Sequence, residues 1–136
     1  MSALAVAPVT TALTTKELWN KSLREARKAG LSVKQNVREC CRGCVDVVEV
    51  MGLKDEDNDA WAYTYGGQGM ATKWQDDRMI PAYTPRYARR NQNVDEVYFN
   101  HGNGAGAILV KAFRANGFTV KWDGTESQCV MVNPTI

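Results

Sequence analysis

The stretch TTKELWNKSLREARKAGLSVKQNV, residues 14–37, predicts a helix followed directly by a strand. Thr14 and Glu17 have the spacing of a capping box, in which each side chain accepts a hydrogen bond from the other's backbone N–H. Apolar and small side chains then recur at helical spacing, at Leu18, Trp19, Ser22, Leu23 and Ala26. Gly30 provides the left-handed stop, so the helix covers 14–29. The strand over 31–37 follows from alternation at Leu31, Val33, Gln35 and Val37.

A second helix is predicted over residues 41–51. Its apolar side chains lie at i, i+3, i+4 and i+7, at Cys44, Val47, Val48 and Met51. Gly52 follows as a stop signal. Because the run is rich in β-branched valine, a strand is the alternative. The acidic run 55–59 predicts a solvated turn.

The central part of the chain predicts a hairpin and a long loop. Aromatic residues alternate over 61–65, which predicts a strand with an aromatic face. The glycine-rich residues 66–69 then turn the chain into a short strand over 70–75, which would complete a hairpin with the first. Residues 76–93 lose periodicity and contain two prolines, so they predict a long loop. Loops of that length in a compact domain are often functional.

The C-terminal part predicts one helix and three strands. A strand over 94–99 leads into the glycine-rich turn 102–106, which opens a helix that ends at Gly117. Alternation then predicts two final strands, at 118–122 and 130–132. The predicted order is α-β-α-β-β-β-α-β-β. This order is typical of an α+β fold in which two or three helices pack on a largely antiparallel sheet.

Length and composition predict one globular unit. The chain has 136 residues, of which 44% are hydrophobic and 24% charged, as is ordinary for a soluble domain. We expect a single α+β domain over 14–133 and a flexible tail over 1–13. No stretch approaches the ~20 apolar residues that span a bilayer, and the tail lacks the basic residues of a secretory signal. These features predict a cytoplasmic protein without a membrane partner.

The basic, aromatic segment 73–90 is the strongest binding candidate. Besides Lys73, it mixes cations with rings at Trp74, Arg78, Tyr83, Arg86, Tyr87, Arg89 and Arg90. Arg, Tyr and Trp dominate protein–protein contacts, and the same mixture can stack bases and contact phosphates. A net charge of +2 is too small to demand a nucleic acid. A protein partner is therefore favoured over nucleic acid, and an ordinary surface loop anchored by its rings is the third interpretation.

Three of the four cysteines lie within five residues, at Cys40, Cys41 and Cys44. The Cys41-x-x-Cys44 spacing is that of a zinc knuckle, but a structural zinc ion needs four ligands. The remaining soft donors are Cys129 and His101. Packing of the thiols at the start of a buried helix is the favoured interpretation. Zinc bound by Cys40, Cys41, Cys44 and Cys129 is one alternative, and a redox dithiol is the other.

Two further features have a structural and a chemical interpretation. The turn 102–106 could hold a phosphate with its backbone N–H groups. It matches neither G-x-G-x-x-G nor a Walker A loop, so a tight turn with close helix–strand packing is favoured. His101, the sole histidine, is expected to be a hydrogen-bonding residue of this turn and not a general base. With no catalytic motif present, we predict a non-enzymatic protein.

Two segments together resemble a known family. They are residues 35–44, QNVRECCRGC, and residues 112–125, AFRANGFTVKWDGT. The pairing resembles a small, mostly actinobacterial and actinobacteriophage family of unknown function, with a Gln-Asn-x-x-Cys-Cys-x-x-Cys-like and a Trp-Asp-Gly-Thr-like motif. Here Glu39 intervenes before the cysteine pair, and Val45 stands where that pattern has glycine. The resemblance implies a single α+β unit, and it is consistent with a bacteriophage accessory protein that binds a host protein.

Overall fold

The computed structural model describes residues 12–39, 44–67, 70–82 and 93–136. Within these ranges the chain forms α2 (Thr15–Lys28), β1 (Ser32–Val37), α3 (Val47–Met51), β2 (Trp61–Tyr65), β3 (Thr72–Gln75), β4 (Arg78–Pro81), β5 (Val97–Gly102), α4 (Ala105–Ala115), β6 (Thr119–Lys121) and β7 (Val130–Asn133). The predicted α+β class is confirmed. The predicted order of elements matches only roughly, because the structure adds β4. The tail predicted over 1–13 lies almost wholly outside the described residues.

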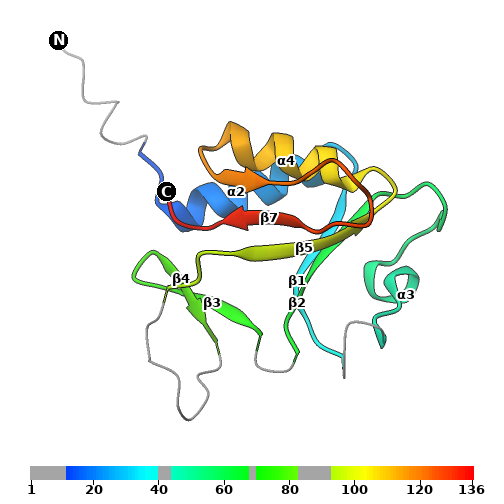
Figure 1. Cartoon of the computed structure of the whole chain (residues 1–136), viewed down its shortest axis with the longest axis horizontal. Coiled ribbons are helices and arrows are strands. Elements are labelled where there is room, and N and C mark those ends of the chain that lie inside the picture. Colours follow the sequence, from blue (N-terminus) through cyan, green and yellow to red (C-terminus); the bar gives the residue numbers. More distant parts are fainter. Residues whose placement is uncertain (1–11, 40–43, 68–69, 83–92) are drawn as a thin grey trace.

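A five-stranded sheet in the order β1-β2-β5-β7-β6 forms the centre of the fold. Its β1–β2 pair is parallel, and the other neighbouring strands are antiparallel. Helices α2 and α4 lie side by side over one face of this sheet (Figure 1). The hairpin β3–β4 forms a separate two-stranded sheet. Within the described ranges, every helix is too short or too polar to cross a lipid bilayer.

The core lies between the two helices and the sheet, with Trp19 at its centre. This side chain is fully buried, and its ring contacts those of Phe99, Phe113 and Phe118 at centroid distances of 6.1, 4.7 and 5.5 Å. Its indole N–H donates to Gln35 Oε1 over 2.8 Å, so the polar atom of a buried ring is satisfied. Trp19 of α2, at the middle of the core, is thus bonded to Gln35 of β1 and joins the helix and the strand that were predicted over 14–37.

The predicted capping box at the start of α2 is confirmed. Thr14 Oγ1 accepts from the backbone N–H of Glu17 over 3.1 Å, and Glu17 Oε1 accepts from that of Thr14 over 3.0 Å. Two of the N–H groups that no helical carbonyl can reach are satisfied in this way. At the other end, Gly30 has a φ of 100°, as expected of a left-handed stop.

The predicted hairpin between 61–65 and 70–75 is wrong. Strand β2 pairs with β1 and β5, whereas β3 pairs with β4. The chain reverses at Asp76 and Asp77, which have φ values of 52° and 59°. Aspartate tolerates this left-handed conformation better than most residues, and two such residues in succession suit a two-residue hairpin turn. Part of the loop predicted over 76–93 is therefore a strand, and residues 83–92 lie outside the described ranges.

The second predicted helix is much shorter than expected. It was predicted over 41–51, but α3 begins only after Asp46, whose carboxylate accepts from the backbone N–H groups of Val48 and Glu49. The cap at Asp46 decides where the helix starts, although the apolar periodicity already begins at Cys44, because the cap satisfies N–H groups that would otherwise be unpaired. The predicted stop at Gly52 is confirmed, with a φ of 65°.

Candidate functional site

The predicted binding segment 73–90 is described only in part. The structure places Trp74 and Arg78 but not the other predicted members, Tyr83, Arg86, Tyr87, Arg89 and Arg90. Trp74 is half-buried, and its ring meets that of Trp19 edge-on at a centroid distance of 6.1 Å. Arg78 is exposed, and its guanidinium donates to Asn93 Oδ1 over 3.4 Å. Trp74 thus anchors the hairpin to the core, while Arg78 faces solvent. A binding surface on this segment stays a prediction.

The predicted metal ligands are not brought together in the described part of the chain. Cys44 is exposed just before α3, so its predicted burial at the start of a helix is wrong. Cys129 is half-buried, and its thiol donates to Asn100 Oδ1 over 3.5 Å. Among the described residues, no group of three histidine, cysteine or acidic side chains is placed to hold a metal ion. The zinc alternative therefore rests on Cys40 and Cys41, which lie outside those residues.

The glycines of the turn 102–106 allow two tryptophan rings to pack closely on the backbone. A Cβ atom on Gly102 would lie 2.6 Å from the ring of Trp61, and one on Gly106 would lie 2.5 Å from the ring of Trp122. Carbon atoms in contact keep roughly 3.5–4.0 Å apart. The packing interpretation of this turn is therefore confirmed at both positions.

A carboxylate of the protein occupies the N-terminus of α4. Gly104 precedes the helix with a φ of 85° and offers no capping side chain. Its N–H instead donates to Glu126 Oε1 over 3.0 Å. A negative charge at this point stabilises the helix, whose N-terminus carries a partial positive charge. A phosphate at the same place would compete with Glu126.

His101 lies within β5 and not on the turn that follows, so its predicted position is wrong. It is 7% exposed, and its Nε2 lies 2.7 Å from the carbonyl oxygen of Gln128. Because a carbonyl oxygen only accepts, Nε2 carries the proton. The ring of Trp122 meets the imidazole edge-on at 5.4 Å and donates its N–H to the same oxygen over 3.1 Å. His101 thus ties Gln128 to β5, and Trp122, which follows β6, donates to the same carbonyl oxygen.

The Trp-Asp-Gly-Thr motif builds a tight turn in this chain. Asp123 Oδ1 accepts from the hydroxyl of Thr125 over 2.7 Å and from its backbone N–H over 2.9 Å. These two bonds favour the charged carboxylate and lower the pKa of Asp123. Trp122 also donates its indole N–H to the carbonyl oxygen of Thr125 over 2.9 Å. The described contacts of the motif are therefore structural.

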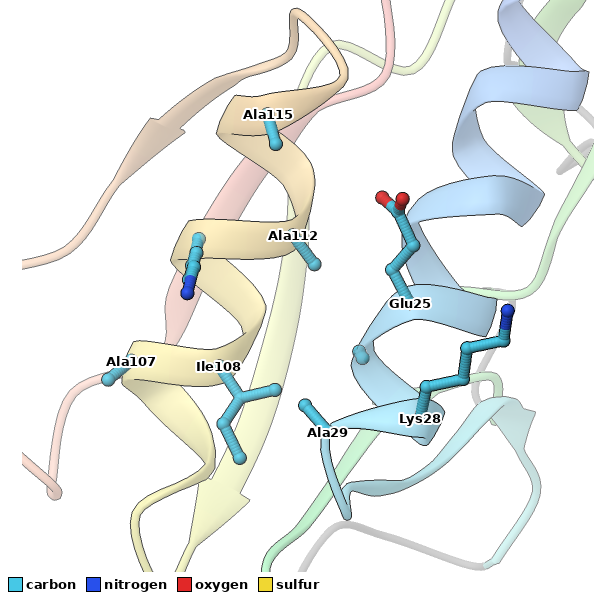
Figure 2. Close-up of a pocket in the computed structure, with 9 residues that line it drawn as sticks. Glu25, Lys28, Ala29, Ala107, Ile108, Ala112 and Ala115 are labelled. Carbon is cyan, nitrogen blue, oxygen red and sulfur yellow. The ribbon is translucent and has the colours of Figure 1, made fainter.

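A groove of about 700 Å³ runs between α2 and α4 (Figure 2). Its lining is dominated by alanines and one larger apolar side chain, namely Ala26, Ala29, Ala107, Ala112, Ala115 and Ile108. Figure 2 shows Ile108 of α4 and Ala29 of α2 directed toward one another across it. Short side chains leave the two helix backbones accessible to a third element, since the distance between packed helices depends on the side chains at the contact.

The charged side chains that line this groove carry a net positive charge, because two lysines stand against one glutamate. Glu25 contributes a carboxylate, but its Oε1 accepts from Asn116 Nδ2 over 2.7 Å and is engaged within the chain. Lys28 from α2 and Lys111 from α4 also line the groove, and both are exposed. An occupant with carboxylates beside an apolar face would complement this arrangement.

The groove was missed at the level of sequence because two separate helices form it. Each helix taken alone shows only an inward apolar stripe, and its outer alanines resemble ordinary helix formers. The sequence did contain one indication of the groove: Ile108, Ala112 and Ala115 are spaced by four and three residues, so they form an apolar face of α4 that extends toward solvent. This face becomes one wall of a groove only because α2 lies beside it, and the sequence does not give that position.

Comparisons of this chain with protein-family models, with curated proteins and with solved structures found no match. The resemblance carried by residues 35–44 and 112–125 stays a prediction. The function must therefore be inferred from the residues of this chain.

Proposed function

We propose that this protein is a non-enzymatic accessory protein that binds another protein through the groove between α2 and α4. The single observation that carries this proposal is the groove itself, about 700 Å³ in volume and walled by alanines and Ile108. An amphipathic helix is the occupant that fits best, because its apolar ridge inserts between two neighbouring helices when their facing side chains are short. If the chain is encoded by a bacteriophage, the partner is a protein of the host.

The charge around the groove restricts which helix it accepts. Two exposed lysines, Lys28 and Lys111, line the groove together with one exposed glutamate, Glu25, whose carboxylate accepts from Asn116. A partner helix with aspartate or glutamate beside its apolar ridge would place carboxylates near both ammonium groups. Such complementarity accelerates association and sets the register of the complex. The partner is therefore an acidic amphipathic helix within a larger protein.

The test compares variants of the groove with matched variants elsewhere. Ala107→Arg fills the groove from an exposed position of α4, and Lys111→Glu reverses its charge. The matched controls are Ala12→Arg, before α2, and Lys121→Glu, on β6, both at exposed positions. Proteins captured from a lysate of the source cells by the wild-type chain are purified and titrated by calorimetry against each variant.

We expect one purified partner whose affinity falls at least tenfold with either groove variant and is unchanged with either control. A synthetic helix from that partner, with acidic residues beside an apolar ridge, should bind with the same pattern. Equal affinities for groove and control variants would contradict the proposal. Loss of binding in a Tyr87→Ala, Arg89→Ala double variant alone would assign the contact to segment 73–90 instead. Failure to capture any protein would also count against it.

A further inference from the structure

The same helix–turn–strand unit occurs twice in this chain. Its first copy, RKAGLSVK at residues 27–34, links α2 to β1, and its second, RANGFTVK at residues 114–121, links α4 to β6. In both copies an arginine is followed by a glycine after three residues and by a valine after six. Gly30 and Gly117 have φ values of 100° and 92°. Both helices therefore end in the left-handed conformation that glycine favours.

The backbone hydrogen bonds of the two units also match. The glycine N–H donates to the carbonyl oxygen of the arginine, over 3.0 Å at Gly30 and 3.1 Å at Gly117. The residue after the glycine, Leu31 or Phe118, is buried and donates its N–H to the carbonyl oxygen five residues earlier, over 3.1 Å in both units. These two bonds define a Schellman motif. The turn thus returns the chain beside the last turn of its helix, where the arginine lies.

In both units the arginine side chain reaches the strand that follows. Nη2 of Arg27 donates to the carbonyl oxygen of Val33 over 3.1 Å, and Nη2 of Arg114 donates to that of Val120, also over 3.1 Å. β1 and β6 are the two edge strands of the five-stranded sheet. Paired strands lie only about 4.8 Å apart, which leaves no room for a guanidinium between them. Each arginine therefore binds its strand from the open side of the sheet.

Open strand edges attract further strands, because they present backbone N–H and C=O groups that have no partner in the sheet. Proteins limit this pairing with charged side chains, short edge strands and bulges. β1 has a register shift between Lys34 and Val37, where Asn36 has a φ of 57°. β6 has three residues, with Val120 in the middle. On each edge, the arginine thus occupies an acceptor in the regular part of the strand.

We propose that Arg27 and Arg114 prevent the two edges of the sheet from pairing with strands of further copies of this chain. Each guanidinium takes an acceptor that an added strand would need, and it places a charge where that strand would have to lie. The edges of two copies can otherwise align, because both contain a hydroxyl residue, a valine and a lysine in succession. Both edges are separate from the groove between α2 and α4, so failure of this proposal leaves the proposed protein-binding function untouched.

Sedimentation velocity of the full chain over a range of concentrations tests the proposal. Methionine in Arg27→Met and Arg114→Met keeps an apolar stem but has no N–H donor. We expect the wild type to stay monomeric and each single variant to form dimers, with a dissociation constant at least tenfold lower than that of the wild type. The double variant should form larger assemblies, because a copy with one open edge pairs once, whereas a copy with two open edges continues to add copies.

The control is the double variant Lys16→Met, Arg24→Met. It removes two positive charges from exposed positions of α2 that are away from both edges, so it matches the change in net charge and should stay monomeric. Hydrogen exchange then locates the contact. The backbone N–H of Gln35 on β1 should exchange more slowly in the Arg27→Met dimer than in its monomer, and that of Val120 should do so in the Arg114→Met dimer.

Three outcomes would overturn the proposal. They are monomers at every concentration for both arginine variants, equal association of the control, and assembly without slower exchange at Gln35 or Val120. The last would mean that the copies associate through another surface. If the amide spectrum shows that a methionine variant does not fold, glutamine takes its place, because its side chain is polar but shorter than that of arginine. The same association is then expected.

Discussion

The carboxylate of Asp77 accepts a 2.9 Å hydrogen bond from the backbone N–H of Thr15, which lies 62 positions earlier in the chain. Its second oxygen accepts from the N–H of Lys16, also over 2.9 Å. Together with the capping box of Thr14 and Glu17, these bonds satisfy the N–H groups of the first turn of α2. The turn of the β3–β4 hairpin therefore completes the N-terminus of a helix distant in sequence.

Replacing Asp77 with asparagine should weaken this contact. Asparagine tolerates the φ of 59° but exchanges one acceptor oxygen for a donor and removes the negative charge. We expect the free energy of unfolding to fall by about 1 kcal/mol, as for the loss of a helix cap. Urea unfolding at neutral pH measures it. Asp76→Asn is the matched control at the other turn residue and should change stability little. Equal effects of both variants would exclude a capping role for Asp77.

Stability should decline in acid partly through the start of α2. The backbone N–H of Thr14 lowers the pKa of Glu17 below 4.5, and the backbone N–H of Lys16 lowers the pKa of Asp77 below 3.8. Folding thus favours both charged forms. Their contribution is complete above the unfolded-state pKa values and is lost as pH falls through the lower, folded-state values. In urea titrations from pH 7 to pH 2, the Glu17→Gln, Asp77→Asn double variant should lose less stability than the wild type. If the double variant and the wild type lose the same free energy of unfolding between pH 7 and pH 2, this expectation is refuted.

The variant Gly106→Ala should be less stable than the wild type, although alanine is the better helix former by roughly 1 kcal/mol. Its Cβ would lie 2.5 Å from Cζ2 of Trp122, so the ring or the helix must move. Overpacking of this kind costs about 1–3 kcal/mol, which should appear as a lower thermal midpoint. In a double-mutant cycle, Trp122→Leu should relieve most of that cost. A stabilised Gly106→Ala variant would show that the ring does not pack there.

Removal of metal ions should leave the fold unchanged. In the described part of the chain no three ligands converge, and the thiol of Cys129 is directed to Asn100. We expect less than one zinc ion per chain by elemental analysis and the same thermal midpoint with and without a chelator. One zinc ion per chain, lost when Cys41 and Cys44 are both replaced by serine, would establish the zinc alternative instead.

Predictions that depended on interactions between neighbouring residues were more accurate than predictions that depended on contacts between distant residues. Helices α2 and α4 were located correctly because their end signals, Thr14 with Glu17 and the left-handed Gly117, act within one turn. The start of α3 was misplaced because two local signals competed there, and the cap at Asp46 won over the periodicity that begins at Cys44. The partner of β3 was misplaced because hairpin pairing was inferred from neighbouring glycines, whereas Asp76 and Asp77 form the actual turn.

The candidate sites depended still more on long-range contacts. His101 was recognised as a hydrogen-bonding residue, but its burial depends on Trp122 and on the carbonyl of Gln128, which come from another part of the chain. The groove between α2 and α4 has no counterpart in either helix alone. For both sites, the residue types could be seen in the sequence, but the arrangement that makes them a site could not.

The amino-acid sequence by itself determined which segments become helices and strands in most of this chain, because caps, turns and apolar periodicity act over a few residues. Only the tertiary structure decided that Asp77 completes α2, that β2 lies between β1 and β5, and that α2 and α4 form a groove between them. Those contacts join residues far apart in the chain, and the need to bury Trp19 and its aromatic neighbours selects among the many pairings that the local signals allow.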